Sequence, residues 1–482
     1  MAARTGKEYI AGLRDERVVW LGNEKVNVLE HPALRGSLQG MAGYFDWQHR
    51  YPSDCLVPDP ETGQSMNASL IVPRNGADLA RRRACFERIA RYSQGMLGRT
   101  PDYVNVTLAG FVARSDVFSQ TGNQFAAERL RRFYREVVEK DLSLTHTIIQ
   151  PVVDKSIGET VGVNGQLAAR VVRRTRDSIV VSGAKILGTL GPFADELFVY
   201  PGIPLPPDAD PSYALAFSIP IKTKGLITLC RDHYGVAGAV GDHPFSSRFD
   251  EQDAFIIFDE VEVPNERVFI DGDIRVYNDL MRHGWAANVI QQTAIRAAVK
   301  LEFAYELASR MAKAVNSERR PEVAAMLGEI WAYSALTRAA IKAAEAGAHE
   351  WGNGAFFCDD APFNAIRAVM PLWMPRVNEI LKLVGSHNLL ATPTLGAIEN
   401  PELGPMIERY MPGAAGMSAR ERAKLFRTAW DFVGSALGGR IELYERFYLT
   451  SSARTFAMDH FLAQQEREWS ELPNFLHASG VG

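Results

Sequence analysis

The run AANVIQQTAIRAAVKLEFAYELASRMAKAV, residues 286–315, decides the expected fold. It is rich in Ala, Leu, Glu and Arg, residues that favour a helix, and residues 321–346 have the same composition. Two more helical patterns follow, around residues 364–390 and 418–438. Long neighbouring helices of this kind normally pack as an antiparallel bundle. The sequence therefore predicts a helical bundle, with a tail, over residues 276–482.

The chain upstream of this bundle has a different texture. Between residues 141 and 275, short β-branched runs such as Ser178-Ile-Val-Val-Ser182 are broken by Gly, Pro and Asp. This pattern is typical of strands, and strands at this density predict a compact barrel or sandwich. Before them, Leu79, Phe86 and Ile89 recur at helical spacing.

We therefore expect an α+β protein with three domains, which matches the number that the length suggests. They are a mainly helical N-terminal domain (1–140), a central β-barrel domain (141–275) and a C-terminal antiparallel helix bundle with its tail (276–482).

Composition excludes several classes of function. The 482 residues are 46% hydrophobic and 23% charged, with a formal net charge of -4, so nothing favours nucleic acid or an anionic membrane as partner. No apolar run approaches the roughly 20 residues that span a bilayer. The N-terminus is polar, and the four cysteines are far apart without metal-ligand spacing. We expect a cytosolic protein with reduced thiols and assign no metal.

The fingerprint of a dinucleotide-binding fold is missing. That fold needs Gly-x-Gly-x-x-Gly directly after a strand. Residues 235–241 have the wrong glycine spacing, and residues 158–165 lack the paired glycines. If a redox cofactor binds, it does not use this motif, and its electrons come from elsewhere.

Gly98-Arg-Thr-Pro-Asp-Tyr103 is the sharpest local feature. Pro101 restricts Thr100 to extended geometry, so Arg99 and Tyr103 are expected on a stiff turn, suited to an electron-rich ring. The alternative is a helix-ending turn with a surface arginine. His146 is open to two interpretations, a structural histidine or, if Arg99 and Tyr103 lie nearby, part of a phenol-binding cluster. An imidazole with the ordinary pKa of about 6.5 accepts or shares a phenolic proton at neutral pH.

Three glycine-bearing segments are candidates for contact with a planar cofactor. Residues 150–160 and 183–189 follow or end strands, and each is open to interpretation as an ordinary turn. Residues 434–440 carry three glycines within a helical pattern, where each costs about 1 kcal/mol relative to Ala. Either a ligand or a tight helix crossing accounts for them.

Taken together, ordered motifs resemble the 4-hydroxyphenylacetate 3-hydroxylase family of flavin-dependent monooxygenases nearly end to end. The motifs are Arg4-Thr-Gly-Lys-Glu-Tyr9, Gly22-Asn-Glu-Lys-Val26 with His31-Pro32, Gly98–Tyr103, Val181-Ser-Gly-Ala-Lys185, His243–Glu251, Trp430-Asp-Phe-Val-Gly-Ser435 and Gly439–Arg446.

The resemblance implies an acyl-CoA-dehydrogenase-like fold and a homotetramer, or at least a dimer, with FAD held between subunits. A separate NAD(P)H-dependent flavin reductase would supply FADH2, which fits the absent dinucleotide motif. Reduced flavin and O2 would form a C4a-hydroperoxide, whose outer oxygen is transferred to the carbon ortho to a phenol oxygen, giving a catechol. The protein would supply orientation and a dry pocket.

The resemblance also assigns site residues. Arg99, Tyr103 and His146 match the catalytic and substrate-binding trio, with His146 at the phenolic oxygen. The implied flavin contacts are Val152, Asp154, Lys155, Gly158, Thr189, Ser435, Leu437, Gly438 and Gly439, the last four from a neighbouring subunit.

The substrate's para substituent is left open. Residues 193–196, Phe-Ala-Asp-Glu, look like the chlorophenol and nitrophenol branch, which places Ala194 and Asp195 against the substrate. The closing Leu443-Tyr-Glu-Arg446 looks like the 4-hydroxyphenylacetate branch. Two other functions remain: a CoA-ester dehydratase-like lyase, which needs cysteine ligands for an iron–sulfur cluster, and a non-catalytic flavin-binding paralogue.

Overall fold

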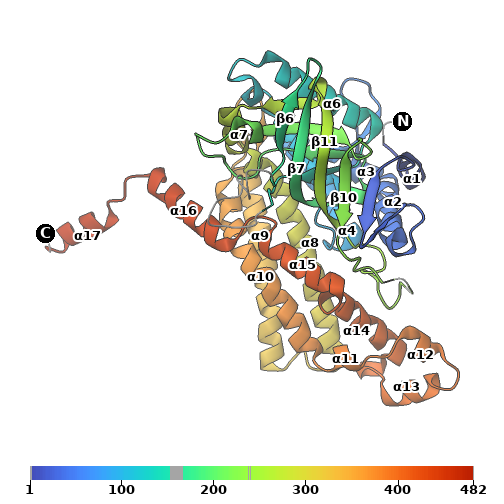
Figure 1. Ribbon diagram of the computed structural model, residues 1–482. Coiled ribbons are helices and arrows are strands. Elements are labelled where there is room, and N and C mark those ends of the chain that lie inside the picture. The colour runs from blue at the N-terminus through green and yellow to red at the C-terminus, as the bar shows by residue number, and fades with distance from the viewer. Residues whose placement is uncertain (1–2, 152–166, 237, 239, 481–482) are drawn as a thin grey trace.

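A computed structural model describes residues 3–151, 167–236, 238 and 240–480. Two β-sheets and the N-terminal helices form one end of the molecule, and a bundle of long helices extends from them (Figure 1). Within the described ranges, no helix is both long and apolar enough to cross a membrane.

The predicted bundle is confirmed. Its long helices α8, α9 and α10 pack against one another, and α14 and α15 lie against α10. Two helices begin and end within one residue of the predicted limits because their periodicity is unbroken. The bounds are α8 (Trp285–Ala314), α9 (Pro321–Ala346), α10 (Ala361–Gly385), α14 (Ala419–Val433) and α15 (Ala436–Phe447).

The glycine-bearing segment breaks one expected helix into α14 and α15. A Cβ on Gly434 would lie 2.4 Å from the Trp430 ring, so the chain turns where only glycine fits. Ser435 then caps α15, because its Oγ accepts a hydrogen bond from the Gly438 N–H at 3.0 Å and donates one to the Asp431 carbonyl at 2.7 Å.

The N-terminal helices α4 (Gly76–Ser93) and α5 (Pro101–Ala113) both pack on α8. Pro101 is the first residue of α5, where its missing N–H costs nothing. The other helices are α1 (Gly6–Gly12), α2 (Arg35–Arg50), α3 (Pro52–Cys55), α6 (Gln124–Lys140), α7 (Ile274–Asp279), α11 (Asn388–Ala391), α12 (Leu395–Glu399), α13 (Gly404–Tyr410), α16 (Ser452–Glu466) and α17 (Glu471–Ala478).

The expected strands form separate sheets. A six-stranded sheet has the order β2 (Glu24–Lys25), β1 (Val18–Leu21), β10 (Leu226–Cys230), β11 (Asp253–Pro264), β7 (Ser178–Thr189), β6 (Arg170–Arg174). A four-stranded sheet has the order β12 (Val268–Asp271), β9 (Leu215–Pro220), β8 (Glu196–Val199), β5 (Leu144–Thr147). Two small ribbons pair β3 (Leu56–Pro58) with β4 (Ser65–Asn67) and β13 (His349–Glu350) with β14 (Phe356–Phe357).

The expectation of a closed barrel is wrong in this detail. In the part of the chain that the structure describes, no named strand pairs between the two large sheets, and a single isolated bridge, Ile149 to Ile186, joins them. The sheets instead share an apolar core, in which the rings of Phe217 and Phe258 lie 5.9 Å apart. Face-to-face packing buries both inner faces without closing the hydrogen-bond ladder.

The expected domain limits at residues 140 and 275 stay a prediction. Strand β1, from the N-terminal zone, pairs in parallel with β10 of the large sheet. One apolar core also runs from the N-terminal helices into the bundle. The three zones therefore share cores, and the active-site candidates lie where they meet.

A glycine in β7 offers a test of this packing. Gly183 has a φ of +113°, and a Cβ there would lie 2.4 Å from the Ala168 carbonyl oxygen. We expect Gly183→Ala to lower the free energy of unfolding by about 1–3 kcal/mol, measured by urea denaturation. The control is Gly76→Ala, whose Cβ would meet open space, and an equal effect of both changes would contradict the explanation.

Candidate active site

The three predicted catalytic residues come together from three elements. Arg99 lies in the turn between α4 and α5, Tyr103 in the first turn of α5, and His146 on β5. The Arg99 guanidinium carbon is 3.8 Å from the centre of the Tyr103 ring. The Tyr103 and His146 rings are stacked, with centroids 5.3 Å apart. Tyr103 thus belongs to a helix rather than to the expected turn.

Arg99 and His146 line a cavity of about 360 Å³. Its walls are mostly apolar and aromatic, which is the usual character of a small-molecule site. The other lining residues are Ile148, Ile149, Ile186, Leu187, Thr189, Asp253, Arg440, Leu443, Tyr444, Phe447 and Tyr448.

The Arg99 guanidinium is buried among aromatic rings. Its carbon lies 5.3 Å from the ring centre of Tyr444 and 5.5 Å from that of Tyr448, and these two rings are stacked on each other. A Cβ on Gly98 would lie 2.4 Å from the Tyr444 ring, so glycine is what lets that ring approach. Arg99 Nη2 donates to the Tyr448 carbonyl at 3.4 Å, while Nη1 is buried without a partner among the described residues.

The proton affinity of His146 differs from the expectation. Burial, and then the nearby Arg99 charge, hold the pKa of His146 well below its usual 6.5. The imidazole is therefore neutral at physiological pH. The idea that it titrates near pH 6.5 needs correction, since the sequence gives no measure of burial. A neutral imidazole still accepts a hydrogen bond from a phenol.

A chain of charged groups forms one wall of the cavity. Arg440 donates to Glu251 at 2.6 Å and to Asp253 at 2.6 and 2.9 Å. Glu251 accepts a hydrogen bond from the Arg99 backbone N–H, and Asp253 accepts one from Thr189 Oγ1 at 2.9 Å. Burial opposes ionisation of Asp253, but the Arg440 guanidinium lowers its pKa.

Sequence reasoning missed the residues that hold the site. Glu251, Arg440 and Tyr444 lie within motifs quoted for the family resemblance, but none was given a role. Asp253 and Tyr448 lie just beyond those motifs. The sequence offered one signal. Arg440 follows directly after paired glycines in a helical pattern of the kind that is normally buried.

The predicted flavin contacts have different outcomes. Thr189 lines the cavity. Val152, Asp154, Lys155 and Gly158 lie outside the described residues.

The four predicted flavin contacts of the third glycine segment, Ser435, Leu437, Gly438 and Gly439, do not line the cavity of their own chain. Leu437 is fully buried, and a Cβ on Gly438 would meet the Phe432 carbonyl at 2.9 Å, so both serve the crossing of α14 and α15. Ser435 is occupied as a helix cap, whereas Gly439 faces open space. The expected contact of these residues with a neighbouring subunit's cofactor stays a prediction.

The structure does not bring Ala194 and Asp195 to this cavity. The Arg4 Nη2 atom lies 2.6 Å from the Asp195 carboxylate, which also accepts the Ser143 N–H at 2.7 Å. Ala194 is buried, and its carbonyl accepts a hydrogen bond from Arg17. Asp195 thus anchors the N-terminal segment, and its charge is matched by Arg4. The expected role of these two residues in substrate binding stays a prediction.

The chain matches two described families. Residues 5–270 match 4-hydroxyphenylacetate 3-hydroxylase N terminal, and residues 280–471 match 4-hydroxyphenylacetate 3-hydroxylase C terminal. The chain belongs to this family. The 4-hydroxyphenylacetate 3-hydroxylase resemblance inferred from the motifs is therefore confirmed.

Relatives within the 4-hydroxyphenylacetate 3-hydroxylase family share about a third of their residues with this chain. The 4-hydroxyphenylacetate 3-monooxygenase oxygenase component of Thermus thermophilus is 33% identical, over 99% of this chain and 98% of that protein. The 4-nitrophenol 2-monooxygenase oxygenase component of Rhodococcus sp is 31% identical, over 92% and 85%.

Solved structures agree with the fold. A 4-hydroxyphenylacetate 3-monooxygenase oxygenase component complexed with FAD and 4-hydroxyphenylacetate has a TM-score of 0.91 at 33% identity, covering 99% of both chains. A 4-hydroxybutyryl-CoA dehydratase from N. maritimus has a TM-score of 0.86 at 18% identity, covering 100% of this chain and 95% of that one, which shows the fold alone.

The state of His146 can be measured directly. In the unfolded chain His146 takes up a proton below about pH 6.5, whereas the folded protein keeps it neutral. The free energy of unfolding therefore falls as the pH drops below that value. We expect the His146 imidazole, followed by NMR of labelled histidine, to stay neutral from pH 8 to pH 6. Arg99→Met should raise its pKa, though burial keeps it under 6.5; an ordinary titration in the unaltered protein would contradict this.

Proposed function

We propose that the chain is the oxygenase component of a two-component monooxygenase, which uses reduced FAD and O2 to convert a para-substituted phenol into a catechol. The names of the relatives support this reaction, and family membership covers nearly the whole chain. Arg99, Tyr103 and His146 are its catalytic residues in this proposal.

The observation that carries the proposal is a buried hydrogen-bond donor of Arg99 that has no acceptor. A buried charge normally has a partner, yet Arg99 Nη1 has none among the described residues. The Tyr103, Tyr444 and Tyr448 rings offer only their faces. Burial raises the pKa of Tyr444 and Tyr448, so they stay neutral. A negatively polarised oxygen of a ligand would accept the hydrogen bond that Arg99 Nη1 leaves unused.

The described residues also fit a flavin ring. The cavity is largely apolar, and Thr189 Oγ1 donates to Asp253, which leaves its own lone pairs to accept a hydrogen bond from a ring N–H. Thr189 would hold the ring from this wall. When bound, reduced FAD supplies the activation of O2.

The protein's own groups prepare the phenol. His146, neutral and buried, accepts the hydrogen bond of the phenol O–H, and Arg99 stabilises the negative charge that develops on this oxygen. The more phenolate character the oxygen has, the more electron density reaches the ortho carbon. Ile148, Ile149 and Ile186 exclude water from the reacting atoms.

The proposed partners follow from this chemistry. Reduced FAD comes from a separate NAD(P)H-dependent flavin reductase in this proposal. Two relatives are named as oxygenase components, which supports a second component. We also propose the homotetramer that the family resemblance implies. The cytosolic location expected from the sequence stays a prediction.

The reaction is tested with a panel of para-substituted phenols. With FADH2 supplied by any flavin reductase, we expect catechol formation from at least one of 4-hydroxyphenylacetate, 4-chlorophenol and 4-nitrophenol, measured by chromatography. The corresponding anisoles, which lack the phenolic proton, should give no product. Flavin binding without hydroxylation of any phenol would instead indicate a non-catalytic paralogue.

His146 has a separate prediction. Because its contact is with substrate rather than flavin, His146→Ala should leave FADH2 binding within a few-fold while hydroxylation falls about 10²-fold. Consumed O2 should then appear as H2O2. The control is His349→Ala, an exposed histidine on β13. Unchanged catechol yield in His146→Ala would remove this residue from the mechanism.

A further inference from the structure

The imidazole of His146 is held by aromatic rings rather than by hydrogen bonds. Among the residues that the structure describes, none forms a hydrogen bond with the His146 side chain. Its ring lies against two tyrosine rings instead. The centroid distance is 5.3 Å to Tyr103 and 5.4 Å to Tyr200. Both imidazole nitrogens therefore stay available to a ligand.

The backbone on either side of His146 is fixed, which leaves only the side-chain torsions to be set. Thr145 Oγ1 donates to the Thr189 carbonyl at 2.6 Å, and Thr147 Oγ1 donates to the Ile186 carbonyl at 2.9 Å, so β5 is tied to β7. The torsion that turns a histidine ring has broad minima of its own. Contacts of the ring must therefore decide where its two nitrogens lie.

Tyr200 is fully buried, and its own ring has a fixed place. It follows directly after β8, on which Phe198 pairs with His146. Residues two apart along a strand lie on one face of a sheet. The Tyr200 ring packs on Phe198, with centroids 5.1 Å apart, and on Phe111 of α5, with centroids 5.4 Å apart. A ring held between a strand and a helix gives His146 a firm support.

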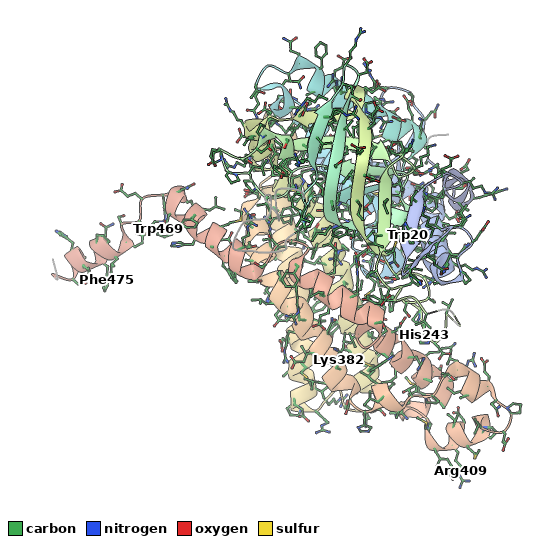
Figure 2. All side chains as sticks on the ribbon, in the orientation of Figure 1. Trp20, His243, Lys382, Arg409, Trp469 and Phe475 are labelled. Atoms are coloured by element: carbon green, nitrogen blue, oxygen red, sulfur yellow. The ribbon has the colours of Figure 1, made fainter. Side chains whose placement is uncertain are left out.

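This support lies behind the cavity wall. His146 lines the cavity, whereas Tyr200 does not. The sheets that carry the site form one end of the molecule, and Lys382 and Arg409 lie on helices at the other end (Figure 2). An effect of Tyr200 on a bound phenol therefore has to pass through the imidazole.

We propose that Tyr200 is a positioning residue, whose ring keeps the His146 imidazole turned so that it accepts the hydrogen bond of the phenol. The proposal rests on the role given to His146 in the proposed function. When the imidazole turns away, the phenol oxygen loses its acceptor and the ortho carbon receives less electron density. Reduced FAD and O2 then end as FAD and H2O2 without forming a catechol.

The orientation of the imidazole is tested first, without flavin or substrate. The readout is the nuclear Overhauser effect between the ring protons of His146 and Tyr103, in protein with labelled histidine and tyrosine. Its His146 signal is assigned by its loss in His146→Gln. Tyr200→Leu removes the supporting ring and should weaken this effect at least about two-fold, the lower limit for an aromatic pair. Tyr200→Phe keeps the ring and should leave the effect unchanged.

The consequence for the reaction is tested with a phenol that the unaltered protein hydroxylates. Tyr200→Leu should lower the catechol formed per FADH2 consumed by about 2- to 10-fold, which is the range for an aromatic pair, with the balance appearing as H2O2. Tyr200→Phe should keep the yield of the unaltered protein. The control is Phe217→Leu, which removes an equally buried ring from β9, in the core between the sheets. It should change neither measurement, although both Leu variants lose stability.

Three results would overturn the proposal: an unchanged Overhauser effect in Tyr200→Leu, an equal loss in Phe217→Leu, or a Tyr200→Phe variant that behaves like Tyr200→Leu. If circular dichroism shows that Tyr200→Leu does not fold, Tyr200→Met replaces it, because the flexible Met chain fills the space without a ring. Should the unaltered protein hydroxylate no phenol, the proposed function fails, while the Overhauser effect still decides whether Tyr200 holds the imidazole.

Discussion

The burial of one guanidinium without a carboxylate governs the candidate site. Removing Arg99 from water is costly unless its charge is compensated. The described structure compensates it with the faces of three tyrosine rings, with the Tyr448 carbonyl and, without a direct side-chain contact, with the Glu251 charge. The same charge helps to keep His146 neutral. A cation that is always charged beside an imidazole that is not gives the cavity an unequal pair, in which one group attracts negative charge and the other accepts a hydrogen bond.

The rest of the fold keeps this arrangement in place. Glu445, one residue after Tyr444, is buried at 2.9 Å from both Arg296 and Lys300 of α8, which fixes α15 against the bundle. Burial opposes ionisation of Glu445, but these two cations lower its pKa to about 2. Arg440, on the same helix, joins α15 to Glu251 and to β11. Tyr444 thus lies between two ion-paired residues of α15.

Long periodic elements could be read from the sequence, and contacts between distant segments could not. The limits of α8 and α9 follow from an unbroken helical pattern, and Arg99, Tyr103 and His146, which the family resemblance singled out, lie together in the structure. The ion pair of Asp195 could not be foreseen because its partner, Arg4, is 191 residues away. The closed barrel was wrong for a related reason: periodicity identifies strands, but only the pairing between them decides whether a sheet closes.

The end of helix α15 lies both at the cavity and at the start of the C-terminal helix α16. Tyr448, which accepts the Arg99 hydrogen bond, follows directly after α15, and the next carbonyl, that of Leu449, accepts one from Arg367 of α10 at 2.8 Å. Arg99 and Arg367 therefore hold the backbone between α15 and α16. These contacts fix the backbone at Tyr448 and Leu449, so the Tyr444 and Tyr448 rings keep their places beside Arg99. This anchoring explains how the largely exposed helix α16 can follow directly after the wall of a buried site.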